Sequence, residues 1–276
     1  MAGLRWGAEF ASGDAMRIYD EVMRPRMFDP WAVLLLDVAA VAIGERVLDV
    51  GTGPGTVARL AAQRVGPSGR VVGADLSAAM LAIARSKPAA EGAAAIEYVQ
   101  CPAGALAVPT AEFDVVTCQQ ALQFVPDRVA AASELRRAAR PGGRLAVVVW
   151  SALEDSPAFA ALASGVREVL GGDAAEAYRN GPYGFPDAEA LAGVLRAAGW
   201  REVEVRRREL PVVFEEGAGQ LAHALAPSPI ASGVAALGEA GYDRLVGAVA
   251  AAAAPLTDGA GVIRALGAAN VATAVA

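Results

Sequence analysis

Three glycines at every second position follow a short apolar segment that contains an acidic residue. The segment reads Val47-Leu48-Asp49-Val50, and the glycines are residues 51, 53 and 55. A second apolar segment, at 71–74, is followed directly by Asp75. Glycine lets the backbone turn sharply and approach a ligand where a Cβ would intrude, and a carboxylate at the end of the next strand is placed to accept hydrogen bonds from a ribose diol. The spacing therefore predicts a site for an adenosine-containing ligand.

Two common nucleotide motifs do not fit this loop. A phosphate-binding P-loop requires a lysine after its last glycine, and none follows Gly55. A dinucleotide fingerprint requires a different glycine spacing, which Thr56 breaks. The pattern Asp49-x-Gly51-x-Gly53-x-Gly55 instead resembles motif I of the class I S-adenosylmethionine-dependent methyltransferases. A carboxylate at Asp49 can meet the methionine ammonium of that cofactor, directly or through water.

The elements that must position these residues alternate between strand and helix, which predicts an α/β fold with helices on both faces of a parallel sheet. With the resemblance, we expect a Rossmann-like, doubly wound, seven-stranded sheet whose last strand is antiparallel, together with a helical cap beside the carboxyl ends of the strands. Strands are expected at residues 46–50, 70–75, 96–100, 113–119, 144–150, 203–213 and 261–276, with a Pro-Gly-Gly turn at 141–143 before the fifth. Helices are expected at 13–23, 30–42, 56–65, 77–85 and 126–139, and the alanine run at 250–254 is also read as helix.

Four segments are expected along the chain. Residues 1–44 form helices that close the site, and residues 45–150 form the cofactor-binding core. Residues 151–200 form an insertion or lid, because this stretch is longer than one crossover helix requires. Residues 201–276 complete the sheet and carry the helical cap at 216–256.

Composition excludes several classes of function. The net charge is −6 and no basic tract is present, which argues against nucleic acid as the main partner. With a single histidine no zinc site is expected, and the two cysteines are expected to be reduced. No apolar run is long enough to span a membrane, and the amino-terminal residues do not resemble a signal peptide, so a cytoplasmic location is expected. A homo-oligomer is left open.

The resemblance extends beyond the glycine loop. The run Ala121-Leu122-Gln123-Phe124-Val125-Pro126-Asp127, followed by Leu135-Arg136-Arg137-Ala138-Ala139-Arg140-Pro141-Gly142-Gly143, is similar to the ubiquinone/menaquinone-biosynthesis-type (methyltransferase type 11) branch. That branch includes many natural-product methyltransferases. The similarity is good over residues 19–150 and loose over the remainder.

This resemblance implies a set of cofactor contacts. The glycine loop would wrap the methionine end, Asp75 would hold the ribose hydroxyls, and Leu76 and Met80 would flank the adenine. Relatives commonly have an acidic adenine acceptor where this chain has Pro102, so the backbone at Ala103 and Gly104 is expected to serve instead. The full set of expected cofactor-binding residues is Asp49, Gly51, Thr52, Gly53, Gly55, Asp75, Leu76, Met80, Ala103, Gly104, Gln119 and Gln120.

The expected substrate pocket is rich in aromatic side chains. It comprises Tyr19, Gln123, Phe124, Trp150, Tyr178 and Tyr183. Relatives often carry histidine near Gln123, whereas an amide orients a substrate but cannot act as a base. No catalytic residue is assigned, and the candidates are Tyr19, Gln123 and His223. After the fourth strand the chain lacks the Asn/Asp-Pro-Pro-aromatic motif of enzymes that methylate base amines, which again argues against a nucleic-acid substrate.

The function expected from these features is methyl transfer from S-adenosylmethionine to a small or medium-sized apolar metabolite, releasing S-adenosylhomocysteine. A carbon or oxygen acceptor is favoured and nitrogen stays open, in secondary or quinone/isoprenoid-type metabolism. Alignment of the reactants can supply roughly 7–11 kcal/mol of the acceleration, so a general base is not essential. The alternative is a protein of the same fold that binds the cofactor and catalyses a rearrangement or cyclisation, or only binds, without methyl transfer.

Overall fold

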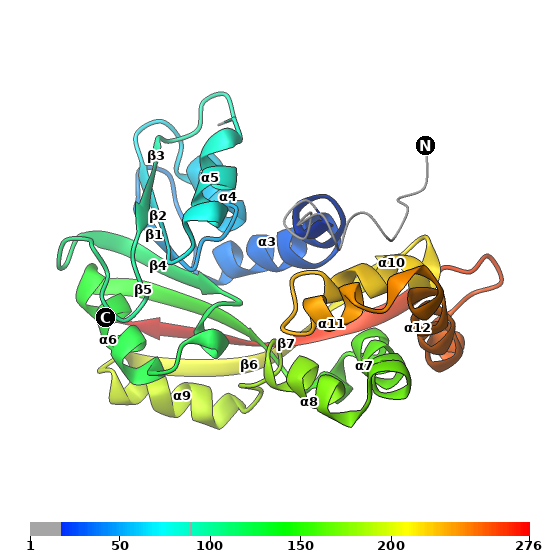
Figure 1. Ribbon diagram of the computed structural model, residues 1–276. Helices are drawn as coiled ribbons and strands as arrows, with labels where there is room; N and C mark the ends of the chain where they lie inside the picture. The colour runs from blue at the N-terminus through cyan, green and yellow to red at the C-terminus, as the bar shows by residue number, and fades with distance from the viewer. Residues whose placement is uncertain (1–17, 89) are drawn as a thin grey trace. The chain divides into compact units, whose positions relative to one another are not determined.

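The computed structural model describes residues 18–88 and 90–276 of this chain. Its sheet has seven strands in the order β3-β2-β1-β4-β5-β7-β6 (Figure 1). The strands are β1 (Arg46–Val50), β2 (Arg70–Asp75), β3 (Ile96–Gln100), β4 (Phe113–Gln119), β5 (Ala139–Trp150), β6 (Arg201–Phe214) and β7 (Ile263–Val275).

The direction of the strands confirms the expected fold class. Strand β1 pairs in parallel with β2 and β4, β2 with β3, and β4 with β5. Strand β7 pairs with β5 in the antiparallel direction, with Trp150 opposite Ala269 and Arg144 opposite Val275. The carboxyl ends of β1, β2 and β4 therefore lie at one edge of the sheet, which is where ligands bind in open α/β sheets.

The described part of the chain divides into two compact units. The sheet unit comprises Phe28–Trp150, Phe185–Arg208 and Ala269–Ala276, and the helical unit comprises residues 18–27, Ser151–Gly184 and Glu209–Ala268. The sheet unit holds α3 (Asp29–Val38), α4 (Thr56–Val65), α5 (Ala78–Ser86), α6 (Arg128–Ala138) and α9 (Ala188–Ala197). The helical unit holds α7 (Pro157–Leu170), α8 (Gly172–Asn180), α10 (Gly217–Ala222), α11 (Ala231–Ala235) and α12 (Gly238–Ala253).

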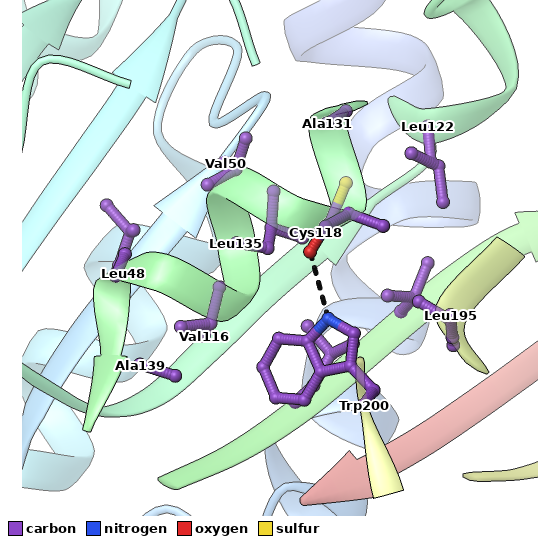
Figure 2. Close-up of a cluster of buried hydrophobic side chains, with 14 of the residues drawn as sticks. Leu48, Val50, Val116, Cys118, Leu122, Ala131, Leu135, Ala139, Leu195 and Trp200 are labelled. Atoms are coloured by element: carbon purple, nitrogen blue, oxygen red, sulfur yellow. Dashed lines mark hydrogen bonds between the residues drawn. The ribbon is translucent and has the colours of Figure 1, made fainter. Parts of the chain in front are cut away.

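One face of the sheet unit packs against α6 and α9. Its core joins side chains of the central strands, such as Leu48 and Val116, to Leu135 of α6 and Leu195 of α9 (Figure 2). The indole nitrogen of Trp200 donates a buried hydrogen bond of 3.0 Å to the Ala132 carbonyl, shown dashed in Figure 2. Because side chains alternate along a strand, residues 47, 49, 115 and 117 face the opposite side. Helices α3 and α4 contact the sheet, and Figure 1 shows α4 and α5 beside β1–β3.

Several expected boundaries are corrected by tertiary pairing. Strand β5 begins at Ala139 rather than residue 144, because the segment around the Pro-Gly-Gly sequence joins the sheet with a register shift beside Phe113. Helix α3 ends at Val38 rather than residue 42, and a π-helix, Tyr19–Phe28, precedes it. The helix expected at 13–23 lies partly outside the described residues.

The expected insertion at 151–200 is shared between the two units. Its first part, Ser151–Gly184, belongs to the helical unit, and its last part contributes α9 to the sheet unit. The placement of a helical cap beside the strand ends stays a prediction. Among the residues that the model describes, no helix is long and apolar enough to cross a membrane.

Candidate active site

The glycine loop connects β1 to α4 at the carboxyl edge of the sheet. Gly51, Gly53 and Gly55 have φ angles of 70°, 54° and 81°, in the left-handed region that favours glycine. The amide groups of Gly51 and Thr52 both donate to the Ala74 carbonyl, at 2.8 and 3.0 Å. The loop is therefore fixed to the end of β2, beside Asp75.

The three glycines face different surroundings. A Cβ added to Gly51 would lie 2.2 Å from the Cβ of Ala121, and one added to Gly55 would lie 2.6 Å from the Tyr98 hydroxyl. No atom lies within 4 Å of the corresponding position on Gly53. The loop is therefore packed tightly against protein at its two ends and is open at its centre, where a ligand can approach the backbone.

Asp75 is held by the backbone on both sides of its carboxylate. Oδ2 accepts a hydrogen bond of 2.8 Å from the Gly53 amide, and Oδ1 accepts one of 2.8 Å from the Ser77 amide. Ser77 in turn caps α5, where its hydroxyl accepts from the Met80 amide. The side chain of Leu76, between them, is 68% exposed. The carboxylate thus has a fixed orientation, and each oxygen keeps a lone pair for a further donor.

Asp49 lies beneath the loop in a row of residues that crosses the sheet. In the strand register it is opposite Thr117 on β4 and Gly73 on β2, and Gly73 is opposite Tyr98 on β3. Asp49 is 1% exposed, and its Oδ1 accepts a hydrogen bond of 2.9 Å from the Thr117 hydroxyl. No hydrogen bond of normal geometry reaches its Oδ2 or the hydroxyl of Thr52. The Thr52 hydroxyl and the backbone at Ala58 lie close enough to favour the charge of this carboxylate, and a carboxylate oxygen has a further lone pair that a cationic or hydrogen-bonding ligand group can use.

Burial raises the pKa of Asp49 from 3.8 to about 6. The hydroxyls of Thr52 and Thr117 oppose this rise, the negative charge of Asp75 adds to it, and the backbone at Ala58 opposes it. The ionised carboxylate therefore destabilises the free protein at neutral pH, and a bound cation would offset this cost.

We expect Asp49→Asn to stabilise the protein without cofactor at pH 8 by roughly 2–3 kcal/mol, because one pKa unit corresponds to about 1.4 kcal/mol. Between pH 4 and 6 the folded state retains a proton that the unfolded chain releases, so the wild-type free energy of unfolding falls as pH rises through this range. Urea denaturation at pH 4 and pH 8 measures the difference. An advantage of the variant that is the same at both pH values would contradict this account.

The glutamines after β4 form a structural network. Gln120 has a φ angle of 53°. Its Oε1 accepts a hydrogen bond of 3.1 Å from the backbone N–H of Trp150 and one of 2.8 Å from the side-chain Nε2 of Gln123. The side-chain Nε2 of Gln119 donates a hydrogen bond of 2.9 Å to the backbone carbonyl of Phe28. Gln119 and Gln123 are 9% and 5% exposed. These side chains hold the end of β4 in place, and the Nε2 of Gln120 is a buried donor with no partner.

Two aromatic residues expected in the substrate pocket lie near this network in sequence. Phe124 is 57% exposed, whereas Trp150 is buried and packs edge-on against Trp31, with ring centroids 5.8 Å apart. An exposed aromatic ring next to the strand ends suits an apolar ligand, and the buried Trp150 supports the sheet edge from within.

The remaining expected residues divide between the units. Met80 and Ala103 are half-buried and Gly104 is exposed, all in the sheet unit. Tyr178, Tyr183 and His223 are buried in the helical unit, where the two tyrosine rings pack together with centroids 6.1 Å apart. The side chain of Tyr19 lies outside the described residues.

Sequence reasoning missed Thr117, Tyr98 and Ala121. The first two belong to the polar row that includes Asp49, and Ala121 is the residue against which Gly51 packs. A threonine and a tyrosine are ordinary strand residues, so their type gives no signal. The signal lies in the strand register, because Thr117 on β4 is the partner of Asp49 on β1.

Comparison with known proteins decides the family. The model of the ubiE/COQ5 methyltransferase family matches residues 13–214, which is well over half of the chain. The chain belongs to the ubiE/COQ5 methyltransferase family. It is an S-adenosylmethionine-dependent methyltransferase, which confirms the resemblance found in the glycine loop.

Curated relatives support this assignment. A protein of Stutzerimonas stutzeri named ubiquinone/menaquinone biosynthesis C-methyltransferase is 33% identical over 183 residues, which are 63% of this methyltransferase and 72% of that protein. The protein of the same name from Hahella chejuensis is 39% identical over 122 residues, 44% of this chain and 49% of that protein. The chain thus spans about three quarters of the first relative and about half of the second.

Solved structures support the fold. A methyltransferase of Bacillus halodurans has a TM-score of 0.56 at 23% identity and covers 88% of this chain and 97% of that one. Phosphoethanolamine N-methyltransferase 2 of Haemonchus contortus, solved with S-adenosyl-L-methionine, has a TM-score of 0.59 at 20% identity and covers 100% of this chain and 60% of that one.

The polar groups around the glycine loop of this methyltransferase fit its cofactor. The open backbone at Gly53 leaves room for the methionine end, and the buried Asp49 carboxylate, whose Oδ2 makes no hydrogen bond of normal geometry, suits an ammonium group. Asp75 presents an oriented carboxylate for hydroxyl donors.

Proposed function

We propose that this methyltransferase transfers a methyl group to a ring carbon of a small or medium-sized apolar quinol. The names of the curated relatives support this acceptor, since they are C-methyltransferases of ubiquinone and menaquinone biosynthesis. The exposed Phe124 beside the end of β4 supports an apolar substrate. The observation that carries the proposal is the arrangement of Asp49, Gly53 and Asp75 at the carboxyl edge of the sheet.

Each of these residues has a proposed part in binding S-adenosylmethionine. Asp75 accepts from the two ribose hydroxyls, and Asp49 meets the methionine ammonium. The loop from Gly51 to Gly55, including Thr52, encloses the methionine end. Adenine lies against Leu76 and Met80, and the backbone at Ala103 and Gly104 serves its polar edge in place of the acidic residue absent at Pro102.

The bound cofactor supplies a methyl group on a sulfonium, which is an activated leaving group. The residues of this chain bind and align the two reactants, and alignment alone can contribute roughly 7–11 kcal/mol. A carbon–carbon bond forms as the methyl–sulfur bond breaks, and the ring carbon then loses its proton to solvent. A quinol ring is electron-rich and its hydroxyl is acidic, so we assign no general base among Tyr19, Gln123 and His223.

A matched pair of acceptors tests this function. The enzyme is incubated with labelled S-adenosylmethionine and either a reduced or an oxidised isoprenoid naphthoquinone that lacks the ring methyl group. We expect S-adenosylhomocysteine and a C-methylated product from the reduced form only, because the oxidised ring is electrophilic. Mass spectrometry with fragmentation distinguishes methylation at carbon from methylation at oxygen.

An O-methylated product would assign a different acceptor atom to the same enzyme. Lack of product from the reduced quinone, with cofactor binding intact, would contradict the proposed acceptor. A cytoplasmic location and a small-molecule partner in place of nucleic acid stay predictions from the sequence, and a homo-oligomer is left open.

A further inference from the structure

Thr117 is a buried polar residue that the proposed cofactor contacts do not include. It is 0% exposed and lies on β4, directly opposite Asp49 in the register with β1. Its hydroxyl lies 2.9 Å from the Asp49 Oδ1 and 3.4 Å from the Leu48 carbonyl. A hydroxyl has one hydrogen to donate, so it can serve only one of these two acceptors at a time.

The two acceptors correspond to the two protonation states of Asp49. When the carboxylate is ionised, the hydroxyl donates to Oδ1 over the shorter distance, in a charge-assisted hydrogen bond. When the carboxylate is protonated, its own O–H can donate to the threonine oxygen while the threonine turns to the Leu48 carbonyl. The ionised state receives the stronger hydrogen bond of the two arrangements.

We propose that Thr117 is a positioning residue for cofactor binding, whose hydroxyl orients Asp49 so that Oδ2 accepts from the methionine ammonium and which favours the ionised carboxylate. The proposal rests on the proposed contact between Asp49 and that ammonium. It adds a residue that acts through Asp49 without touching the cofactor.

The charged and titratable groups around Asp49 do not replace this hydroxyl. Asp75 on β2 repels a negative charge at Asp49. After burial, which is the larger cause, the charge of Asp49 raises the pKa values of Tyr98 on β3 and Cys118 on β4. Arg59 on α4 lies beside Tyr98, where its Nη1 donates to the Pro54 carbonyl. Thr52 and the backbone at Ala58 are the other groups that favour the ionised form.

The test measures the dissociation constant of S-adenosylmethionine by calorimetry between pH 5.5 and 8.5. For the wild type we expect binding to be strongest near pH 7, to weaken below the pKa of Asp49 by up to about tenfold per pH unit, and to weaken again near pH 8 as the α-ammonium of the ligand loses its proton. In Thr117→Val, which keeps the shape and removes the hydroxyl, we expect binding at pH 7.5 to weaken about tenfold. The acid limb, which is the fall in affinity at acid pH, should also move up by about one pH unit. Thr117→Ser should restore the affinity to within about threefold of wild type and return the acid limb to its wild-type pH.

Control variants separate this role from a structural one. Thr273→Val makes the same change on β7 of the sheet and should leave both the affinity and the pH profile unchanged. Asp49→Asn should remove the acid limb, and adding Thr117→Val to it should cause no further loss of affinity. Thr117→Ala provides a second variant without the hydroxyl if Thr117→Val does not fold.

Two results would overturn the inference, and they differ. If Asp49→Asn removes the acid limb but Thr117→Val and Thr117→Ala bind with the wild-type affinity and pH profile, the role of Thr117 is wrong and the proposed cofactor site stands. If Asp49→Asn itself leaves the affinity and the acid limb unchanged, the proposed contact of Asp49 fails, and the role of Thr117 fails with it.

Discussion

Replacing Asp75 with alanine is expected to weaken S-adenosylmethionine binding by roughly 10²–10⁴-fold. Two proposed hydrogen bonds from the ribose to a charged carboxylate are lost, each worth roughly 1.5–3 kcal/mol. The substitution also removes the acceptor for the Gly53 and Ser77 amides, so the glycine loop loses its link to the start of α5. Calorimetry with S-adenosylmethionine and with S-adenosylhomocysteine measures the effect.

Asp187→Ala is the matched control for this variant. The Asp187 carboxylate also accepts from two backbone amides, those of Glu189 and Ala190, at the start of α9. Its loss should lower the free energy of unfolding by about 0.5–2 kcal/mol and leave cofactor affinity unchanged. If Asp75→Ala binds the cofactor as Asp187→Ala does, Asp75 does not hold the ribose.

Gly51→Ala is expected to disrupt folding, whereas Gly53→Ala should fold and lose cofactor affinity. The added methyl group at position 51 would lie 2.2 Å from the Cβ of Ala121, an overlap that requires the loop or the end of β4 to move. Overpacking typically costs 1–3 kcal/mol, and a left-handed backbone adds roughly 1–2 kcal/mol for a residue with a Cβ. A loss of about 2–5 kcal/mol in the free energy of unfolding follows for Gly51→Ala.

At position 53 only the backbone cost applies, because no atom lies within 4 Å of the added Cβ. The methyl group would occupy the open side of the loop, where we propose that the methionine end binds. Urea denaturation and calorimetry on the two variants should therefore separate stability from binding.

Ala121→Gly provides a rescue for Gly51→Ala, because it removes the methyl group that the new Cβ would meet. The double variant should recover most of the stability and retain only the backbone cost. If Gly51→Ala alone is as stable as Gly53→Ala, the close packing of Gly51 against Ala121 does not constrain the loop.

Local sequence was sufficient for the elements that surround the cofactor loop. The strands β1, β2, β3 and β4 and the helix α4 begin and end where the apolar runs and glycines predict. Buried parallel strands must be apolar on both faces, and a sharp turn in the left-handed region requires glycine, so both leave a clear mark in the sequence. The order of these elements predicted the α/β fold, and the resemblance to the methyltransferases added the antiparallel last strand, which the structure confirms.

Expectations that depended on what a side chain contacts needed the structure. Gln119 and Gln120 were expected to meet the cofactor, and their amides also bind the backbone at Phe28 and Trp150. Tyr178, Tyr183 and His223 were expected near the substrate or the chemistry, and they are buried in the helical unit. The residue type of a glutamine or a tyrosine does not reveal whether its side chain binds a ligand or packs in the core.

The alternation of strands and helices along the chain was enough to predict the fold class, and the spacing of acidic residues and glycines in one segment was enough to predict the cofactor and its loop. Tertiary structure decided which residues support that loop from neighbouring strands. Thr117 and Asp49 are far apart in the chain and meet only through the register of β1 and β4. Burial between those strands, which raises the pKa of Asp49 to about 6, is likewise a property of the packed sheet. Hydrogen bonding and dielectric environment depend on distance in space, and strand pairing sets that distance.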